Sequence, residues 1–188
     1  MTPETLKYYA NGQVPRYTSY PTAPHFSPAV DEHLYRAWLG AVRPDTDLSL
    51  YLHVPFCRSM CWYCACHTTV TARAAPVGRY VAALEREIEL VAGALPGRMA
   101  VRLLHFGGGS PTLMSPDELL GLLARLRSHF RVTADAELAI EIDPRTLEAP
   151  MIAALARGGI NRASIGVQSF DPVVQRAINR IQSFEITA

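Results

Sequence analysis

Short apolar runs alternate with amphipathic segments from about residue 48 to the end of the chain. Runs of this kind are typical of buried strands, and the segments between them repeat apolar residues at helical spacing. The predicted strands are Leu48–Val54, Val101–Phe106, Leu138–Asp143 and Ala163–Val167. The predicted helices cover Pro76–Ala94, the segment after Ser115, Pro150–Gly158, and a last helix that starts at Asp171-Pro172 and ends near Ala188. This alternation predicts an α/β fold of about four βα units with a parallel sheet, which right-handed crossovers curve toward a barrel.

The second of these helices has the clearest start signal. Ser115 is followed by Pro116 and, three residues on, by Glu118, which is the capping-box arrangement. Its predicted inward face consists of Leu119, Leu122, Leu123 and Leu126. In the helix before it, Tyr80, Leu84, Ile88 and Val91 have the same helical spacing.

The first part of the chain has a different pattern. Five of the fourteen prolines fall in residues 1 to 30, together with Tyr8, Tyr9, Tyr17 and Tyr20. This composition predicts an extended arm that docks through its aromatic side chains. A short helix is expected at Asp31–Val42, so residues 1–46 are assigned to the arm and this helix, and residues 47–188 to the barrel domain.

Composition narrows the possible classes of protein. The 188 residues are 49% apolar and 19% charged, as in a globular protein with a core, and the net charge is +1. Such a charge gives no electrostatic case for binding nucleic acid or an anionic membrane. The start has no secretory pattern and no stretch is apolar enough to span a membrane, so we expect a cytoplasmic protein without nucleic-acid or membrane partners.

All four cysteines lie within ten residues, as Cys57, Cys61, Cys64 and Cys66. Disulfides are a poor explanation, because such short spacings rarely permit disulfide geometry. Thiolates this close repel one another unless a cation compensates them, which indicates zinc or an iron-sulfur cluster. The C-x3-C-x2-C spacing favours the cluster, since structural zinc sites usually have a second, separate pair of ligands. His53 and His67 lie near enough to keep a mixed cysteine and histidine zinc site open.

Other notable residues share a position with the cysteine loop, at the carboxyl ends of the predicted strands. The loop follows strand one, Gly107-Gly108-Gly109 follows strand two, Glu141 lies near the end of strand three, and Gln168 follows strand four. Functional groups of parallel βα proteins collect at this edge.

Each of these residues also has an ordinary structural interpretation. The glycines could form a tight turn, or could let a ligand approach the backbone. Glu141 lies in a strand that we expect to be covered on both faces, so it needs a partner. That partner is either Arg145 or a neighbouring residue, in a salt bridge, or it is a ligand hydroxyl.

Five more residues near this edge keep similar alternatives. Gln168 could hydrogen-bond loop backbone, and Arg180 could be a solvated helix charge. Tyr51 could be a core aromatic, His53 a hydrogen-bonded strand-end residue, and Tyr63 a packing residue beneath the loop.

Together these motifs resemble the radical S-adenosylmethionine superfamily, whose signature C-x3-C-x2-C matches Cys57 to Cys64. Within it, the chain is similar to the family of oxygen-independent coproporphyrinogen III oxidases. The matching segments are 15–22 (PRYTSYPT), 51–57 (YLHVPFC), 106–112 (FGGGSPT), 140–145 (IEIDPR) and 164–170 (SIGVQSF).

The resemblance implies a partial TIM-like barrel, a [4Fe-4S] cluster and S-adenosylmethionine. Cys57, Cys61 and Cys64 would bind the cluster, and Cys66 would be a fourth, non-ligating cysteine. The residues that would hold S-adenosylmethionine are Tyr51, Gly108, Gly109, Ser110, Glu141, Gln168 and Arg180, with Tyr63 lining the cluster and adenine side. No residue is assigned as directly catalytic.

The implied reaction is the oxidative decarboxylation of coproporphyrinogen III to protoporphyrinogen IX, started by a 5′-deoxyadenosyl radical. The implied partners are the porphyrinogen substrate and an electron donor of the flavodoxin or ferredoxin type, and the full-length protein would be a monomer. Two alternatives stay open: a haem-binding chaperone of the same superfamily, and a zinc-stabilised module without catalytic activity.

The length of the chain departs from this family pattern. Family members have six βα units and a C-terminal domain, whereas this chain ends after the fourth unit. Four units leave two exposed sheet edges, so we expect either that another element covers the edges or that this chain is the front part of a longer protein. We expect that this part holds a cluster but turns over weakly or not at all.

Overall fold

The computed structural model describes residues 2–5, 7 and 22–188 of the chain, which divides into two compact units, 1–35 and 36–188. The predicted docking of Tyr8, Tyr9, Tyr17 and Tyr20 lies outside the described residues. A 3-10 turn, η1 (Ala23–His25), precedes helix α2 (Glu32–Gly40), as expected for a short helix in this region. A domain boundary after residue 46 stays a prediction.

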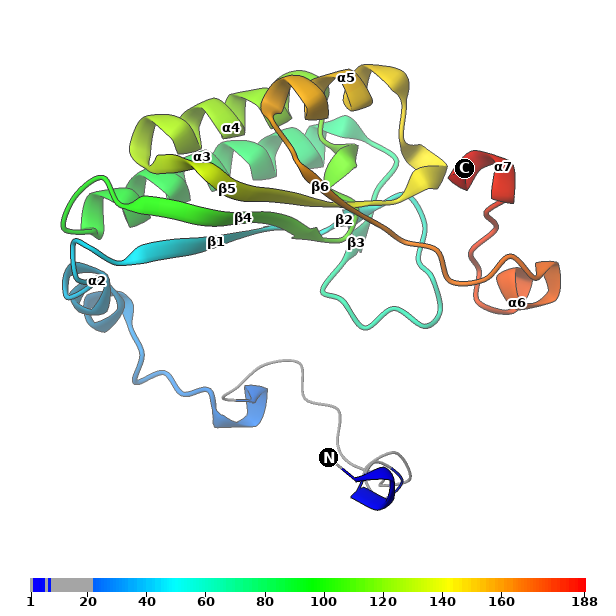
Figure 1. Cartoon of the computed structure of the whole chain (residues 1–188), viewed down its shortest axis with the longest axis horizontal. Coiled ribbons are helices and arrows are strands. Elements are labelled where there is room, and N and C mark those ends of the chain that lie inside the picture. The colour runs from blue at the N-terminus through cyan, green and yellow to red at the C-terminus, as the bar shows by residue number, and fades with distance from the viewer. Residues whose placement is uncertain (1, 6, 8–21) are drawn as a thin grey trace. The chain divides into compact units, whose positions relative to one another are not determined.

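A four-stranded parallel sheet is the centre of the second unit (Figure 1). Its strands are β1 (Asp47–Val54), β4 (Ala100–Gly108), β5 (Arg131–Ile142) and β6 (Arg162–Ile165), in the order β1-β4-β5-β6. All three pairings are parallel, which confirms the predicted α/β class and the four predicted strands. Within the described part of the chain, β1 and β6 are the outer strands of this sheet.

Strand β5 begins seven residues earlier than predicted. Its first residues pair with the start of β4, and the register then shifts between Val101 and Leu103. The early half of β5 contains polar residues such as Thr133 and Asp135, so it lacks the continuous apolar run on which the prediction depended.

Three helices cover one face of the sheet: α3 (Ala74–Ala94), α4 (Pro116–His129) and α5 (Ala149–Gly158) (Figure 1). The capping box of α4 is confirmed, because Ser115 Oγ accepts from Glu118 N at 3.2 Å and Glu118 Oε2 accepts from Ser115 N at 2.6 Å. Helix α5 ends at Gly159, whose φ of 76° is the left-handed conformation that glycine adopts without strain.

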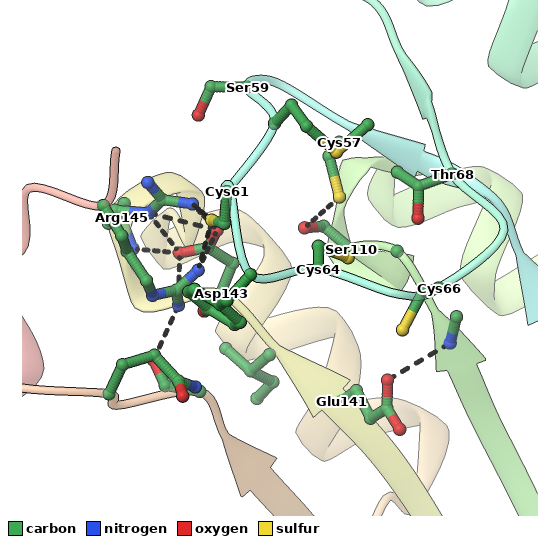
Figure 2. A pocket seen from close by; sticks show the side chains of 18 of the residues that line it. Cys57, Ser59, Cys61, Cys64, Cys66, Thr68, Ser110, Glu141, Asp143 and Arg145 are labelled. Carbon is green, nitrogen blue, oxygen red and sulfur yellow. Dashed lines mark hydrogen bonds and ion pairs between the residues drawn. The ribbon is translucent and has the colours of Figure 1, made fainter. Parts of the chain in front are cut away.

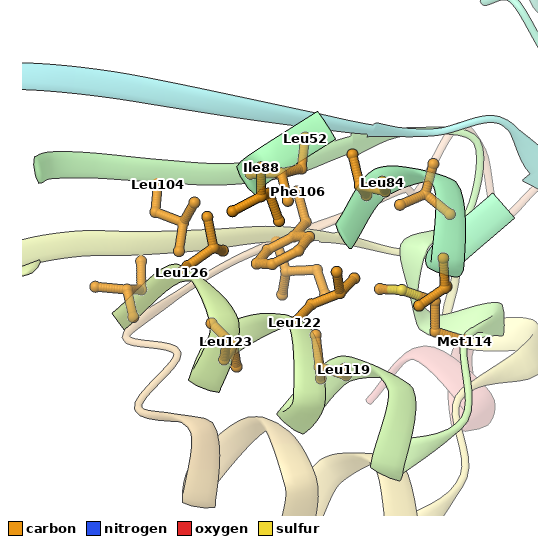
Figure 3. Close-up of a cluster of buried hydrophobic side chains, with 14 of the residues drawn as sticks. Leu52, Leu84, Ile88, Leu104, Phe106, Met114, Leu119, Leu122, Leu123 and Leu126 are labelled. Carbon is orange, nitrogen blue, oxygen red and sulfur yellow. The ribbon is translucent and has the colours of Figure 1, made fainter. Parts of the chain in front are cut away.

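The hydrophobic core lies between these helices and the sheet (Figure 3). Leu52, Leu104 and Phe106 project from the strands. The predicted inward face of α4 is confirmed, because Leu119, Leu122, Leu123 and Leu126 are all at most 1% exposed.

The other face of the sheet is open among the described residues, so the expectation of strands covered on both faces is wrong for this unit. Tyr51 is 59% exposed and Leu103 is 46% exposed. All three helices that cross between the strands lie on the opposite side (Figure 1).

Two short features differ from the predicted pattern. The chain after β6 forms α6 (Pro172–Ala177) and α7 (Phe184–Thr187) instead of one continuous helix, with Asp171 capping α6 as expected. A separate two-stranded parallel sheet joins β2 (Phe56–Cys57) to β3 (Thr69–Val70). Strands of two residues show no periodicity, so the sequence pattern could not predict them. Among the described residues, no helix has the length and apolar character needed to cross a membrane.

Candidate functional site

A cavity opens at the carboxyl edge of the parallel sheet, between the cysteine loop and the ends of β4, β5 and β6 (Figure 2). It brings together ten of the eleven residues that the sequence singled out as ligands: Cys57, Cys61, Tyr63, Cys64, Gly108, Gly109, Ser110, Glu141, Gln168 and Arg180. Tyr51 does not line it. Cys66, Asp143 and Arg145 also line the cavity.

The small sheet β2-β3 closes the base of the cysteine loop. Thr69 N donates to Pro55 O at 2.6 Å and Thr71 N donates to Cys57 O at 2.9 Å. Arg58 Nη1 also donates to Ala72 O at 2.7 Å. These bonds hold the two ends of the loop together, so the four cysteines project from one restrained segment.

All four cysteines are free thiols, and Cys61 is buried. Burial raises the pKa of Cys57, a hydrogen bond with Ser110 at 3.6 Å opposes this rise, and the charge of Cys64 adds to it. Burial and the neighbouring Cys64 also raise the pKa of Cys66. Cys57 and Cys66 therefore resist ionisation unless a nearby cation compensates the charge of their thiolates.

The chemistry of the cavity's donor groups can be compared with the needs of a metal centre. Among the described residues, no group of three His, Cys, Asp or Glu side chains is arranged to hold one ion. The four thiols line one cavity. A cubane cluster needs cysteine ligands spread over its surface, so the donor set fits a cluster.

The glycine run brings bare backbone to the cavity. Gly108 has a φ of 110°, and a side chain there would collide with the ring of His53. A Cβ on Gly109 would lie 2.5 Å from Phe56 O, because Gly109 N and Ser110 N hydrogen-bond to the β1-β2 segment. Gly107 and Gly108 end strand β4 and Gly109 forms a bend after it, so the run is not a tight turn, and Gly108 and Gly109 bring backbone without side chains to the cavity.

Glu141 lies on the open face of the sheet, where Gly108 and His105, and not Arg145, are its partners. Its carboxylate accepts from Gly108 N at 3.1 Å and lies 3.3 Å from His105 Nε2. Of the two suggested salt-bridge partners, Arg145 is wrong, because it pairs with Asp143 at 2.6 Å, whereas the neighbour His105 lies within salt-bridge distance of Glu141. The Glu141 side chain is only half-buried, which leaves it available to a ligand.

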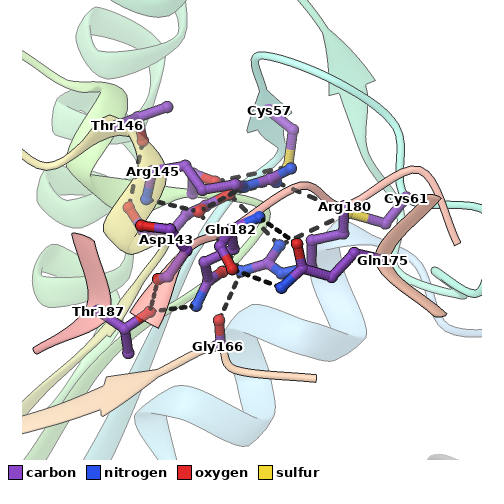
Figure 4. A network of polar contacts seen from close by, with 12 residues as sticks. Cys57, Cys61, Asp143, Arg145, Thr146, Gly166, Gln175, Arg180, Gln182 and Thr187 are labelled. Carbon is purple, nitrogen blue, oxygen red and sulfur yellow. Dashed lines mark hydrogen bonds and ion pairs between the residues drawn. The ribbon is translucent and has the colours of Figure 1, made fainter. Parts of the chain in front are cut away.

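A buried network that the sequence analysis missed lies beside Cys61 (Figure 4). The Asp143 carboxylate binds Arg145 at 2.6 Å and Arg180 at 3.4 Å. Burial opposes ionisation of Asp143, but the hydrogen bond from Arg145 and the charge of Arg180 outweigh it, so the pKa of this carboxyl lies below its ordinary value. Asp143 follows Glu141 by two residues at the strand end, and this spacing was the available signal.

Both arginines also point toward a thiol of the loop. Arg180 Nη1 lies 3.5 Å from Cys61 Sγ, and Arg145 Nη2 lies 3.7 Å from it. Arg180 is therefore a buried side chain and not a solvated helix charge, and its second amino group donates to Gly166 O at 2.6 Å. Its Nε is buried and has no hydrogen-bond partner among the described residues.

The remaining candidates lie at the rim or on the open face. Tyr51 stacks on His105 with ring centroids 5.7 Å apart and is exposed, so it is not a core aromatic. His53 is the predicted strand-end histidine, with contacts to Tyr51 Oη at 3.1 Å and His67 O at 3.0 Å. Tyr63 and Gln168 are exposed at the rim of the cavity.

The chain belongs to the radical S-adenosylmethionine superfamily, because the family sequence model of this superfamily matches residues 51–188. Members of the superfamily use a [4Fe-4S] cluster and S-adenosylmethionine, as the resemblance implied. The cavity described above lies entirely within the matched residues.

Matches to individual proteins indicate a narrower group than the superfamily. The oxygen-independent coproporphyrinogen III oxidase of Bradyrhizobium diazoefficiens is 56% identical over 180 residues, which are 96% of this chain and 40% of that protein. The enzyme of the same name from Escherichia coli is 44% identical over 181 residues, covering 95% of this chain and 38% of that protein.

A solved structure agrees with these sequence matches. The coproporphyrinogen III oxidase of Escherichia coli, a radical S-adenosylmethionine enzyme, matches with a TM-score of 0.85 and 39% identity over 97% of this chain and 40% of that one. The chain therefore spans about two fifths of the length of these relatives. The predicted partial barrel of the radical S-adenosylmethionine type is confirmed.

Proposed function

We propose that this chain carries the cluster-binding and S-adenosylmethionine-binding part of an oxygen-independent coproporphyrinogen III oxidase. The observation that supports this most is the cavity at the carboxyl edge of the sheet. There, three cysteines in the C-x3-C-x2-C spacing face the glycine run, Glu141 and Arg180. The names of the relatives supply the substrate, coproporphyrinogen III.

The proposed cluster ligands are Cys57, Cys61 and Cys64, with Cys66 left unbound. Three protein ligands leave one iron of a [4Fe-4S] cluster open to a ligand that is not protein. Arg145 and Arg180 donate toward the Cys61 sulfur, where positive charge stabilises a thiolate.

The proposed S-adenosylmethionine ligands surround the same cavity. Backbone carbonyls near Gly108 and Gly109 suit the ammonium group, and Ser110 offers a hydroxyl. Glu141 suits the ribose hydroxyls because its carboxylate is anchored by Gly108 N yet half-exposed. Arg180 lines the cavity, and the positive charge of its guanidinium suits the carboxylate.

Three further residues would complete the binding site. Gln168 and Tyr63 lie at the rim of the cavity, where they would lie beside the adenine. Tyr51 lies outside the cavity, but its ring lies so close to Gly107 that a Cβ there would be 2.9 Å from Tyr51 Cε2. Tyr51 would therefore support the glycine run that contacts the ligand.

When bound, the two cofactors supply a one-electron reductant and the 5′-deoxyadenosyl radical that starts the decarboxylation of a propionate side chain. The protein binds and orients these groups and excludes competing reactions. An electron donor of the flavodoxin or ferredoxin type, a monomeric full-length protein and a cytoplasmic location stay predictions.

The test is binding of S-adenosylmethionine to the anaerobically reconstituted chain. A reduced cluster with an open iron should change its electron paramagnetic resonance spectrum when S-adenosylmethionine is added. Glu141→Ala should weaken this binding about tenfold, the scale of one lost hydrogen bond to a charged group. Glu89→Ala, which removes an exposed carboxylate paired with Arg125, is the matched control and should leave binding unchanged.

A colourless protein with one bound zinc ion, or a cluster spectrum that ignores S-adenosylmethionine, would contradict the proposal. Turnover is a separate question. We predict weak or no formation of protoporphyrinogen IX by residues 1–188 alone, and robust formation in an anaerobic assay would show this expectation to be wrong.

A further inference from the structure

The turn Ile178–Arg180, between α6 and α7, contacts the cysteine loop at three consecutive residues. Trp62 N donates to Ile178 O at 3.0 Å, and Asn179 Nδ2 donates to Met60 O at 2.7 Å. Arg180 Nη1 lies 3.5 Å from Cys61 Sγ. Two of these contacts reach backbone on either side of Cys61, and the third reaches its sulfur.

Asn179 has a backbone conformation that few side chains adopt. Its φ of 54° is the only positive value among the non-glycine residues that the structure describes. Asparagine tolerates this region better than other residues with a side chain, but glycine adopts it more freely. An asparagine at this position therefore suggests a role for its amide, and the amide here donates to the cysteine loop.

The turn is itself held in place by a buried glutamine (Figure 4). The Gln175 amide donates to Ser169 O at 2.8 Å and to Gln182 O, while Gln182 N donates back to Gln175 Oε1 at 3.0 Å. Arg180 N also donates to Gln175 O at 2.9 Å. Residues 175–182 thus form a closed segment, and Asn179 presents its amide from a restrained position.

We propose that Asn179 is a positioning residue, whose side-chain amide holds the Cys61 segment of the loop in the conformation that binds the cluster. It acts through the backbone of Met60, to which its amide donates at 2.7 Å. The role as stated rests on the proposed cluster, but the restraint on Cys61 can be measured without one.

The restraint can be measured by alkylation of the reduced, metal-free chain with iodoacetamide, with each cysteine resolved by tandem mass spectrometry. Cys61 is 8% exposed and reacts only when the loop opens, whereas Cys66 on the same loop is exposed and serves as the internal reference. Asn179→Asp keeps the shape and the tolerance of positive φ but cannot donate to Met60 O. Asn179→Gly keeps the backbone conformation and removes the amide.

Both variants should raise the alkylation rate of Cys61 about three- to tenfold, as expected for the loss of one hydrogen bond, with the Cys66 rate unchanged. The matched control is Ile181→Ala, which truncates a 63% exposed side chain two residues further along and should change neither rate. After reconstitution, the variants should also lose iron to a chelator faster than the unaltered chain does.

An unchanged Cys61 rate in both variants would overturn the proposal, as would an equal rise at Cys66, which would indicate general loosening. The proposal would also be overturned if the Cys61 alkylation rate stayed low in Asn179→Gly and rose only in Asn179→Asp. The backbone turn, and not the amide, would then position the loop. If the unaltered chain bound no cluster, the proposed function would fail, while the alkylation rates would still decide the role of Asn179.

Discussion

The two faces of the parallel sheet differ in what they contribute to the protein. On the helix-covered face, Leu52, Leu104 and Phe106 are at most 4% exposed and form the core. On the open face, Tyr51, His105 and Glu141 form a polar chain that leads to the cavity. Because strand side chains alternate between faces, the same strands supply both sets.

This difference separates stability from chemistry. Burial of the covered face stabilises the fold, since apolar area removed from water is its main favourable term. The open face and the carboxyl edge keep polar groups half-exposed and available to ligands. We therefore expect substitutions on the covered face to lower stability and matched substitutions on the open face to leave it nearly unchanged.

The largest effect is expected from a pair of aromatic residues on neighbouring strands. Phe106→Ala empties a fully buried position and should lower the free energy of unfolding by about 3–5 kcal/mol. Tyr51→Ala on the open face should cost about 0.5 kcal/mol or less. Urea denaturation of the metal-free chain measures both, and equal losses would show that the two faces do not differ as described.

An intermediate effect is expected at the buried ion network, where Asp143→Asn leaves Arg145 and Arg180 without their carboxylate. The free energy of unfolding should fall by about 2–3 kcal/mol at neutral pH. The pKa of Asp143 is lowered in the folded state, so its stabilisation is present above the ordinary value of 3.8 and is lost as the pH falls through the lowered pKa.

The difference in stability between Asp143→Asn and the unaltered chain should therefore stay constant from pH 7 to about 4 and shrink at lower pH. Denaturation curves across this range measure it. Asp45→Asn, at an exposed pair with Arg43, is the control and should change little. A difference that persists unchanged below the lowered pKa would contradict the assigned ion pairs.

The smallest effect is expected at the start of α4, a helix of the covered face. Ser115→Ala removes one half of the capping box and should lower the free energy of unfolding by about 1 kcal/mol. Ser115→Asp restores an acceptor for Glu118 N and should recover most of the loss. Thermal denaturation of the unaltered chain and of both variants measures these effects. Identical midpoints for Ser115→Ala and the unaltered chain would show that the cap does not stabilise this helix end.

The sequence predicted the covered face better than the open one. Leu119, Leu122, Leu123 and Leu126 repeat at helical spacing and are all buried, because periodicity reports directly which side chains meet the core. Periodicity does not report whether a second layer covers the other face. The expectation that Glu141 is covered therefore failed, and so did its pairing with Arg145.

The location of the candidate site could be predicted from the sequence, but the contacts between its side chains could not. The topology of a parallel sheet places Cys57, Gly108 and Glu141 at one edge, which the cavity bears out. The clamp of Asp143 by Arg145 and Arg180 depends on side-chain geometry across separate segments. The sequence pattern predicted one helix here, but the turn at Asn179 divides it in two. A residue with positive φ leaves no signal in the hydrophobic periodicity, so this turn could not be predicted.

The proposed function requires that Cys57, Cys61 and Cys64 bind a cluster while Cys66 does not. Iron content and electron paramagnetic resonance of four anaerobically reconstituted variants, each with one cysteine changed to alanine, test it most directly. We predict that Cys66→Ala keeps about four iron atoms per chain, and that each of the other three loses the cluster. Loss of the cluster in Cys66→Ala, or its retention in any of the other three, would contradict the account.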